Sequence, residues 1–256
     1  MPGMIDQVIH EIRGRGIRPK GIKLIGAMAD LVPRAQIAEI TQLLQAPYAN
    51  TFGSTETGIP PMSGGRIPVG ETPTDLSKSQ NSLCEFRLVD AEDRDMPDGT
   101  PGELAFRGPT LFSGYWNAPE ANKKDFRGGW FHMGDMFIRR PGGKLDFVDR
   151  AKYLIKSGGE NIYPAEIERL MAPHPAVAQV AVIGVADERL GEIGCAFVVR
   201  RPAAELSEAD CIAWCRRQMA NYKVPRHVRF VDALPTNASN KVDKKSLRAD
   251  WACGKN

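Results

Sequence analysis

Residues 157–168, which read SGGENIYPAEIE, constrain the fold of this chain more than any other stretch. Two adjacent glycines, Gly158 and Gly159, permit a tight turn without Cβ atoms, so the backbone there can line a narrow passage for another molecule. Pro164 suits the first turn of a helix, because an N–H at that position would have no helical partner. The stretch therefore predicts a glycine-rich turn that leads into a helix beginning at Pro164.

Composition excludes several classes of function. The 256 residues suffice for about one to two domains. The chain has 34 basic and 31 acidic residues, so its net charge is only +3. This charge does not indicate the strongly basic surface that nucleic-acid-binding proteins need. The charged N-terminus lacks the apolar core of a signal peptide, and no apolar run approaches the ~20 residues of a membrane span. Five cysteines without a Cys-x-x-Cys pair favour reduced thiols in the cytoplasm over a metal site.

The first part of the chain has the pattern of an α/β fold. Apolar residues recur at helical spacing near the N-terminus and again over 34–45, and short strands are predicted at 22–26 and 48–51. A strand, helix, strand order indicates parallel strands. Residues 61–82 are rich in Pro, Gly, Ser and Thr, and this composition predicts a loop.

From residue 83 onward the pattern changes twice. Alternating residues predict strands around 84–90 and 103–107, and a hairpin around Gly142 and Gly143, so that the region to residue 150 is expected to form a small β-barrel. After it, the pattern predicts an α+β domain of about 100 residues. Its expected helices and strands are 164–171, 177–185, 194–200, 208–219, 227–231 and 242–248.

Residues 52–58, FGSTETG, follow a predicted strand, where open α/β sheets bind their ligands. Gly53 lets the backbone approach a ligand, and Thr55 offers a hydroxyl group to a phosphate. Glu56 offers the hard oxygen that Mg²⁺ takes beside phosphate oxygens, and Phe52 offers a face on which adenine could stack. Taken alone, an ordinary polar turn is an equal alternative for this loop.

Asp135 follows a glycine, and a carboxylate placed so can accept both hydroxyl groups of a ribose. A capped turn is the alternative. Arg150 and Lys152 come at the expected end of the barrel, where a surface Arg and Lys would be the plain interpretation. His132 could contact a substrate, although a packing residue is preferred. Lys241 lies in a polar loop, where most lysines are simply solvated.

Together these segments resemble the acyl-adenylate-forming enzymes, the family of acyl-CoA synthetases, peptide-synthetase adenylation domains and beetle luciferases. The resemblance covers nearly the whole chain and includes YKVPR at 222–226. Gly26 and Ala27 resemble a family segment that lines the acyl pocket and the adenine site. Two positions depart from the family pattern: Met133 stands where Thr is usual, and Asn240 stands where Gly is usual before the lysine.

The resemblance implies a role for each residue type in an ATP site. Asp135 and Arg150 would hold the ribose, Glu56 would hold Mg²⁺, and Thr55 would contact phosphate. Lys241 would bind the carboxylate substrate and the α-phosphate, and its charge would stabilise the transition state as pyrophosphate leaves.

The same resemblance implies a moving second domain. The turn at Gly158 and Gly159, with Glu160, would line the path of the pantetheine arm of CoA. Lys152 would be the hinge at which this domain rotates between adenylation and thioester formation.

These expectations combine into one hypothesis. The chain would hold a partial α/β adenylation domain at 1–66, a β-barrel at 67–150 and a mobile α+β lid at 151–256. The activity would be that of an AMP-forming acid–thiol ligase using ATP, Mg²⁺ and CoA on a carboxylic acid, which could be short, medium, long or aromatic. Because no Ser/Thr/Gly-rich phosphate loop precedes 52–58, the chain is expected to be a C-terminal part that pairs as a homo-oligomer or with a missing N-terminal half. The alternative is an inert or partner-dependent binding module.

Overall fold

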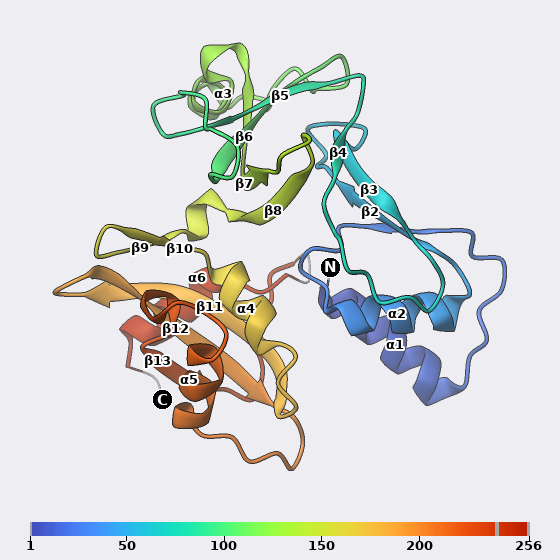
Figure 1. Ribbon diagram of the computed structural model, residues 1–256, viewed down its shortest axis with the longest axis vertical. Helices are drawn as coiled ribbons and strands as arrows, with labels where there is room; N and C mark the ends of the chain where they lie inside the picture. Colours follow the sequence, from blue (N-terminus) through green and yellow to red (C-terminus); the bar gives the residue numbers. More distant parts are fainter. Residues whose placement is uncertain (1, 239–240, 255–256) are drawn as a thin grey trace. The chain divides into compact units, whose positions relative to one another are not determined.

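The computed structural model describes residues 2–238 and 241–254, and the chain divides into two compact units, Met1–Ala151 and Lys152–Asn256 (Figure 1). Each of the four clusters of buried hydrophobic side chains lies wholly within one of the two units. The units are therefore described one at a time.

The first unit begins with a small α/β layer. Helices α1 (Pro2–Arg15) and α2 (Arg34–Leu44) pack against a sheet of four strands in the order β1-β2-β3-β4. As predicted, the first two strands are parallel, and the remaining pairs are antiparallel. The strands are β1 (Ile25–Ala27), β2 (Tyr48–Phe52), β3 (Met62–Ile67) and β4 (Ser79–Gln80).

Two predictions for this layer were wrong. The strand expected at 22–26 begins only at Ile25, and the apolar side chains of Ile22 and Leu24 are exposed. The segment 61–82, predicted as loop, contains β3 and β4. Serine and glycine fill the middle of β3, which hides the strand from a composition argument, while pairing with β2 and β4 supplies its hydrogen bonds.

The second layer of this unit is a purely antiparallel sheet in the order β5-β6-β7-β8. Its strands are β5 (Glu85–Val89), β6 (Gly102–Arg107), β7 (Phe131–Arg139) and β8 (Leu145–Arg150). The last two form the predicted hairpin, with Gly142 and Gly143 at positive φ in its turn. Helix α3 (Pro119–Asp125) and the short 3₁₀ turn η1 (Arg127–Gly129) lie between β6 and β7 along the chain.

The predicted barrel does not close among the described strands. The free edge of β8 pairs with Lys78 rather than with β5, through two backbone hydrogen bonds of 2.9 Å between Lys78 and Leu145. The Lys78 side chain is fully buried, and its Nζ lies 2.5 Å from Oδ2 of Asp30, which is also buried. The antiparallel sheet is therefore open, and its edge is joined to the segment that leads into β4.

The second unit is a five-stranded sheet with a helix layer on each face. The order is β10-β9-β12-β11, and β13 pairs with β12 as well. Alternate residues of β11 and β12 face two separate clusters: Val182, for example, joins the cluster of α4 and α5, and Ile183 joins that of α6. The strands are β9 (Ile155–Ser157), β10 (Glu160–Ile162), β11 (Val177–Asp187), β12 (Gly191–Arg200) and β13 (His227–Phe230). The helices are η2 (Ala151–Tyr153), α4 (Pro164–Met171), α5 (Glu208–Arg216), η3 (Asn221–Lys223) and α6 (Lys244–Ala252).

The glycine-rich turn belongs to a hairpin. Gly158 and Gly159, with φ of 59° and 89°, connect β9 to β10, and only after β10 does α4 begin at Pro164. Two residues at positive φ are what a tight two-residue hairpin turn needs. The helix start was predicted correctly, and the strand between turn and helix was missed. No helix in the described part of the chain has the length and apolar character of a membrane span.

Candidate functional site

The loop after β2 is fixed by its own side chains. Thr57 is buried, and its Oγ1 accepts a hydrogen bond from the Ser54 amide at 3.1 Å and donates one to the Ser54 carbonyl at 3.0 Å. A Cβ on Gly53 would lie 3.2 Å from atoms of Pro60 and Pro61, so the loop packs closely around this glycine. Thr55 is exposed at the tip of the loop, where its hydroxyl is accessible to a ligand.

Glu56 is held by a segment far along the chain. Tyr115 donates its phenol hydrogen to Glu56 Oε1 at 3.1 Å, the Phe112 amide donates to the Glu56 carbonyl at 2.9 Å, and Thr110 Oγ1 donates to the Thr57 carbonyl at 2.8 Å. Sequence reasoning missed this segment. Nothing in the local sequence around Thr110 and Tyr115 indicates that they bond to residues of the 52–58 loop, which lie more than fifty positions earlier in the chain.

These contacts keep Glu56 charged. Partial burial by itself raises the pKa of the Glu56 carboxyl, but hydrogen bonds from Ser54, from the residue's own backbone and from Tyr115, with the positive charge of Arg150, hold that pKa below its ordinary value. Burial and the Glu56 charge raise the pKa of Tyr115 to about 12, so the phenol stays a donor. The effect of Arg150 on both groups couples the loop electrostatically to the end of β8.

Phe52 occupies a different environment from the one predicted. Its side chain is 4% exposed and lies in the core of the first unit, where its ring meets that of Phe137 edge to face at 4.8 Å. The last residue of β2 thus faces inward, and the stacking of adenine on Phe52 stays a prediction.

Asp135 and Arg150 are brought together as directly opposed residues of β7 and β8. Arg150 Nε lies 3.3 Å from Asp135 Oδ1, and Arg150 Nη2 lies 3.4 Å from Oδ2 and donates to the Met133 carbonyl at 3.0 Å. The Asp135 side chain is 13% exposed and that of Arg150 is 44% exposed. Both predicted ribose contacts thus lie side by side at the sheet end, with the arginine more open to solvent.

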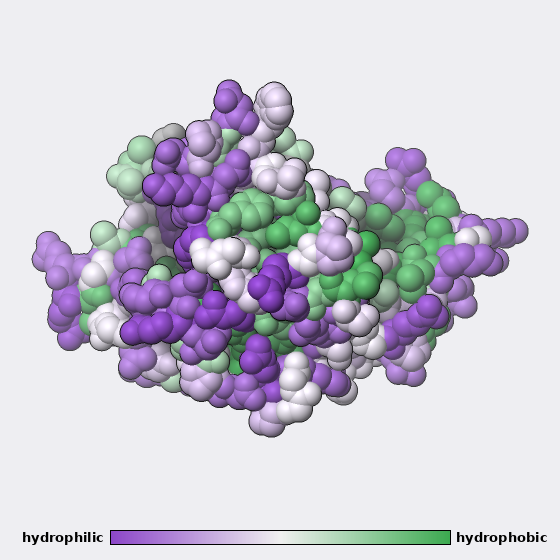
Figure 2. Space-filling view, turned by 90° about the horizontal axis from the view of Figure 1, so that it is seen from above, coloured by the Kyte–Doolittle hydropathy of each residue, from purple (hydrophilic) through white to green (hydrophobic). Residues whose placement is uncertain are grey.

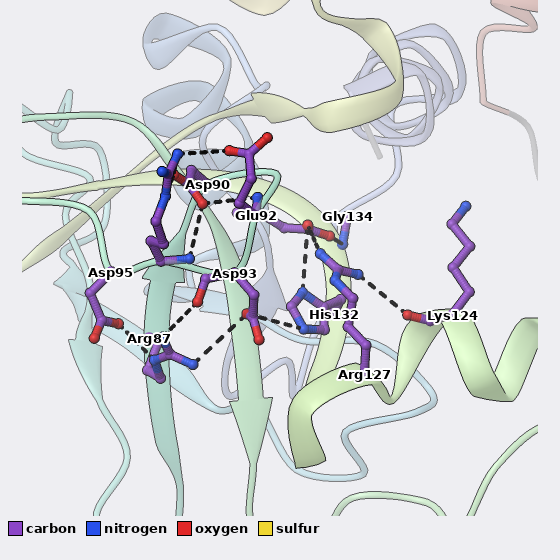
Figure 3. A network of polar contacts seen from close by, with 11 residues as sticks. Arg87, Asp90, Glu92, Asp93, Asp95, Lys124, Arg127, His132 and Gly134 are labelled. Atoms are coloured by element: carbon purple, nitrogen blue, oxygen red, sulfur yellow. Dashed lines mark hydrogen bonds and ion pairs between the residues drawn. The ribbon is translucent and has the colours of Figure 1, made fainter.

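A polar network surrounds His132 in the same unit (Figure 3). His132 is buried, with Nδ1 3.6 Å from Glu103 Oε2 and Nε2 3.7 Å from Asp93 Oδ1. Arg127 Nη2 donates to Glu103 Oε2 at 2.8 Å. His132 therefore faces two carboxylates inside the unit, which agrees with the packing interpretation preferred from the sequence.

The remaining candidates of the first unit lie on β1. Gly26 is exposed, and a Cβ there would meet no atom within 4 Å. Ala27 is buried in the cluster that α1 and α2 form with the sheet. Strand β1 pairs on one side with β2, so both residues lie at the edge of the sheet.

The candidates of the second unit lie in turns and at its start. Gly158, Gly159 and Glu160 are exposed at the β9–β10 hairpin, and Lys152 is the first residue of the unit. The Lys152 ammonium lies 5.0 Å from the centre of the Tyr153 ring. The predicted roles of these four residues stay predictions.

Lys241 is exposed in a short loop closed by a bridge between Thr236 and Val242. The Lys241 amide donates to Asn237 Oδ1 at 3.1 Å, and its carbonyl accepts from the Asn237 amide at 2.8 Å. The neighbouring Asn240, which departs from the family pattern, lies outside the described residues.

Metal binding was predicted for Glu56. Over residues 2–238 and 241–254, no group of three or more His, Cys, Asp or Glu side chains is arranged to hold a metal ion. Mg²⁺ in nucleotide sites commonly takes only one or two carboxylates and fills its shell with phosphate oxygens and water. A single ionised carboxylate at an accessible loop fits that requirement.

Comparison with known families and proteins gives independent evidence about the family of this chain. Residues 2–116 match the family described as AMP-binding enzyme, and residues 166–241 match the one described as AMP-binding enzyme C-terminal domain. Feruloyl-CoA synthase of Amycolatopsis sp is 43% identical over 166 residues, covering 65% of this chain and 34% of that protein. Indoleacetate–CoA ligase of Aromatoleum aromaticum is 33% identical over 256 residues, covering 97% of this chain and 48% of that protein.

Solved structures give the same fold. The crystal structure of an anthranilate CoA ligase in complex with anthranoyl-AMP matches with a TM-score of 0.77 at 28% identity, over 91% of this chain and 46% of that one. O-succinylbenzoate coenzyme A synthetase of Bacillus subtilis, in complex with AMP, matches with a TM-score of 0.76 at 28% identity, over 97% and 49%. The chain thus spans half or less of the length of each of these four proteins.

Proposed function

Because this chain belongs to the family of AMP-binding enzymes, we propose that the protein is an AMP-forming acid–thiol ligase. In the first step, a carboxylate oxygen bonds to the α-phosphorus of ATP and pyrophosphate leaves. In the second, the sulfur of CoA bonds to the acyl carbon and AMP leaves. The observation that carries the proposal is the pairing of Asp135 with Arg150 across β7 and β8, with Arg150 Nε 3.3 Å from Asp135 Oδ1, in the same unit as the exposed Thr55 and the partly buried Glu56.

Within the first unit, the proposal assigns phosphate to Thr55 and ribose to Asp135 and Arg150. Glu56 would hold Mg²⁺, and the ion when bound neutralises charge on the phosphates. Gly53, which is exposed, would let the backbone approach the ligand. Gly26 and Ala27 would form one wall of the acyl and adenine pocket, since β1 leaves them at a sheet edge.

Within the second unit, the proposal assigns the carboxylate and the α-phosphate to Lys241, whose exposed position suits an approaching anion. Gly158, Gly159 and Glu160 would guide the pantetheine arm of CoA along the hairpin turn. Lys152 would be the hinge, and its place as the first residue of the second unit supports that role.

The test is pyrophosphate release by the purified chain with ATP, Mg²⁺, CoA and separate sets of short, medium, long and aromatic acids. Lys241→Ala should lower the rate by about 100-fold or more, because the lysine's charge acts where charge develops. Lys245→Ala, which removes an exposed lysine from α6, is the matched control and should leave the rate unchanged. No release by folded wild-type chain with any acid would contradict the proposal and favour the alternative, a binding module that acts with a partner.

Exposed apolar side chains near the start of the first unit support a second chain or a further part of an adenylation domain as partner. They lie on α1 and on the segments before and after β1, and Figure 2 shows apolar surface on the right, the side on which these elements lie in Figure 1. The side chains are Met4, Val8, Ile17, Ile22, Leu24 and Leu31. Light scattering should find an oligomer, and a monodisperse monomer would contradict self-association. A cytoplasmic location is part of the same proposal.

A further inference from the structure

Strand β7 carries a bulge at the residue proposed to bind ribose. On β6 one residue lies between the paired positions Glu103 and Ala105, whereas on β7 three residues lie between their partners Met136 and His132. The two extra residues leave the ladder interrupted over 133–135. Bulges beside active sites commonly re-aim a side chain, and here the re-aimed segment ends on Asp135.

Glu103 replaces the hydrogen bond that the bulge removes from the ladder. Its Oε1 accepts the Gly134 amide at 3.1 Å, and Gly134 has φ of +71°, a conformation that glycine adopts at little cost. The nitrogen that donates this bond is bonded directly to the Cα of Gly134, the residue that precedes Asp135 in the chain. A carboxylate on the neighbouring strand therefore sets the backbone from which the Asp135 side chain projects.

Glu103 is itself held from two sides. Burial by itself raises the pKa of the Glu103 carboxyl, but its contacts with His132 and Arg127 hold that pKa below its ordinary value, so the acceptor is charged. The Nε2 atom of His132 lies 3.7 Å from Oδ1 of Asp93, a residue at positive φ whose carbonyl accepts from Arg87 Nη2 at 3.0 Å (Figure 3). Fixing an acceptor through a buried second contact is how rigid sites orient the groups that touch a ligand.

We infer that Glu103, which accepts a hydrogen bond from Arg127 and lies against His132, is a positioning residue that holds the bulge at Gly134 and thereby aims the Asp135 carboxylate at the ribose. The inference rests on the proposed function, which assigns ribose to Asp135. Neither Glu103 nor His132 need touch the nucleotide, since both act through the Gly134 backbone.

Amide hydrogen exchange tests the structural half without any ligand. In the full chain, the Gly134 amide should be protected, and Glu103→Ala should raise its exchange rate at least tenfold. Glu103→Gln keeps an oxygen that can accept the bond and should retain most of the protection. Glu85→Ala removes an exposed carboxylate from neighbouring β5 and is the matched control. Equal exchange at Gly134 in Glu103→Ala and wild type would overturn the inference.

Nucleotide binding tests the functional half. Calorimetry would compare AMP with 2′-deoxy-AMP and 3′-deoxy-AMP for each variant. Asp135→Ala should raise the Kd for AMP about 10- to 100-fold, because it removes hydrogen bonds between the ribose and a charged group. Glu103→Ala should lower the preference for AMP over the deoxynucleotides by about threefold or more, as coupled neighbours do, and Glu103→Gln should restore part of it.

The outcomes separate the two claims. If Asp135→Ala loses the preference for ribose and a folded Glu103→Ala keeps it, the inference is overturned and the proposed function stands. If Asp135→Ala binds all three nucleotides as the wild type does, the proposed ribose role fails, and the exchange of Gly134 still decides what Glu103 does to the bulge.

Discussion

Glu56 in the first unit takes its hydrogen bond from Tyr115, 59 residues away, whereas the Lys241 amide in the second unit bonds to Asn237, four residues away. The same contrast holds for the other candidates. Gly134 is held by Glu103 across 31 residues, while Gly158 and Gly159 form a two-residue hairpin turn. The candidate residues Glu56 and Gly134 of the first unit are therefore held by tertiary contacts, whereas those of the second unit lie in exposed turns shaped by local backbone conformation.

The largest expected effect concerns whether the two units unfold separately. Phe106 and Phe197 are matched buried phenylalanines, one in the core of each unit. Each change to Ala should destabilise its own unit by about 3–5 kcal/mol. Calorimetric unfolding should show Phe106→Ala lowering only the transition of the first unit and Phe197→Ala only that of the second. One transition shifted equally by both would refute independent units.

A buried and a half-exposed ion pair sharpen the comparison. Asp30→Ala leaves the buried Lys78 ammonium unpaired and should cost about 3–5 kcal/mol. In the second unit, Lys223 contacts Glu166 at 2.8 Å on a partly exposed surface, so Glu166→Ala should cost at most about 1 kcal/mol. Urea unfolding measures both. As a control, the double replacement of Asp30 by Leu and Lys78 by Met should recover most of the loss, and equal costs for the two single changes would contradict the argument.

The next largest effect is on the stability of the second unit, and it comes from the backbone conformation of the turn between β9 and β10. Gly159→Ala should destabilise the second unit by about 1–2 kcal/mol, because an L-residue is strained at φ of 89° even where space is open. Gly158→Ala should cost more, since its Cβ would also lie 3.0 Å from Leu190 Cδ2. Gly65→Ala on β3, where a Cβ would meet no atom within 4 Å, should be neutral or slightly stabilising in a thermal melt. An effect of Gly65→Ala as large as that of Gly159→Ala would argue against backbone strain.

Tyr115→Phe tests the long-range contact on Glu56 with little change in packing. Losing one charge-assisted hydrogen bond should raise the Mg²⁺–ATP concentration needed for half-maximal pyrophosphate release by about five- to tenfold. Tyr222→Phe removes the phenol of an exposed tyrosine in the second unit and should have no such effect. Identical Mg²⁺–ATP dependence in Tyr115→Phe and wild type would show that the contact does not matter for the loop.

The smallest effect is a pH dependence at Asp75. Hydrogen bonds from the Ser77 amide and hydroxyl, opposed by partial burial and assisted by Lys144 and Arg140, hold the pKa of the Asp75 carboxyl well below its usual range. Because the folded-state pKa is lower than the unfolded one, this stability is present above about pH 4 and is lost as pH falls through the folded pKa.

With the side chain 43% exposed, we expect at most about 1 kcal/mol from Asp75. The difference in unfolding free energy between wild type and Asp75→Asn should shrink from pH 7 to pH 3, and a constant difference would contradict the sign. Asp243, which caps α6 in the second unit, has a lowered pKa for the same reason, hydrogen bonds from Ser246 and Lys245.

Several elements could be predicted because their signals are local. Helices α2 and α4 follow the 3.6-residue period, and the β7–β8 hairpin follows from two glycines between alternating strands. Within that hairpin, a register shift between Met136 and Phe137, which the turn alone does not specify, brings Asp135 opposite Arg150. The strand β3 was missed because Ser and Gly, which mark loops on average, form a strand once neighbouring strands pair with it.

The sequence by itself determined the turns, the periodic helices and strands, and the family-like set of Thr55, Glu56, Asp135, Arg150 and Lys241, because each depends on residues a few positions apart. Only the tertiary structure decided that the Phe52 ring lies in the core, that β8 pairs with Lys78 instead of closing a barrel, and that Tyr115 bonds to Glu56 and Glu103 to the Gly134 amide. The physical reason is that burial and long-range hydrogen bonds depend on which strands pair and in what register, and a bulge of two residues changes which way a side chain points without changing the local pattern.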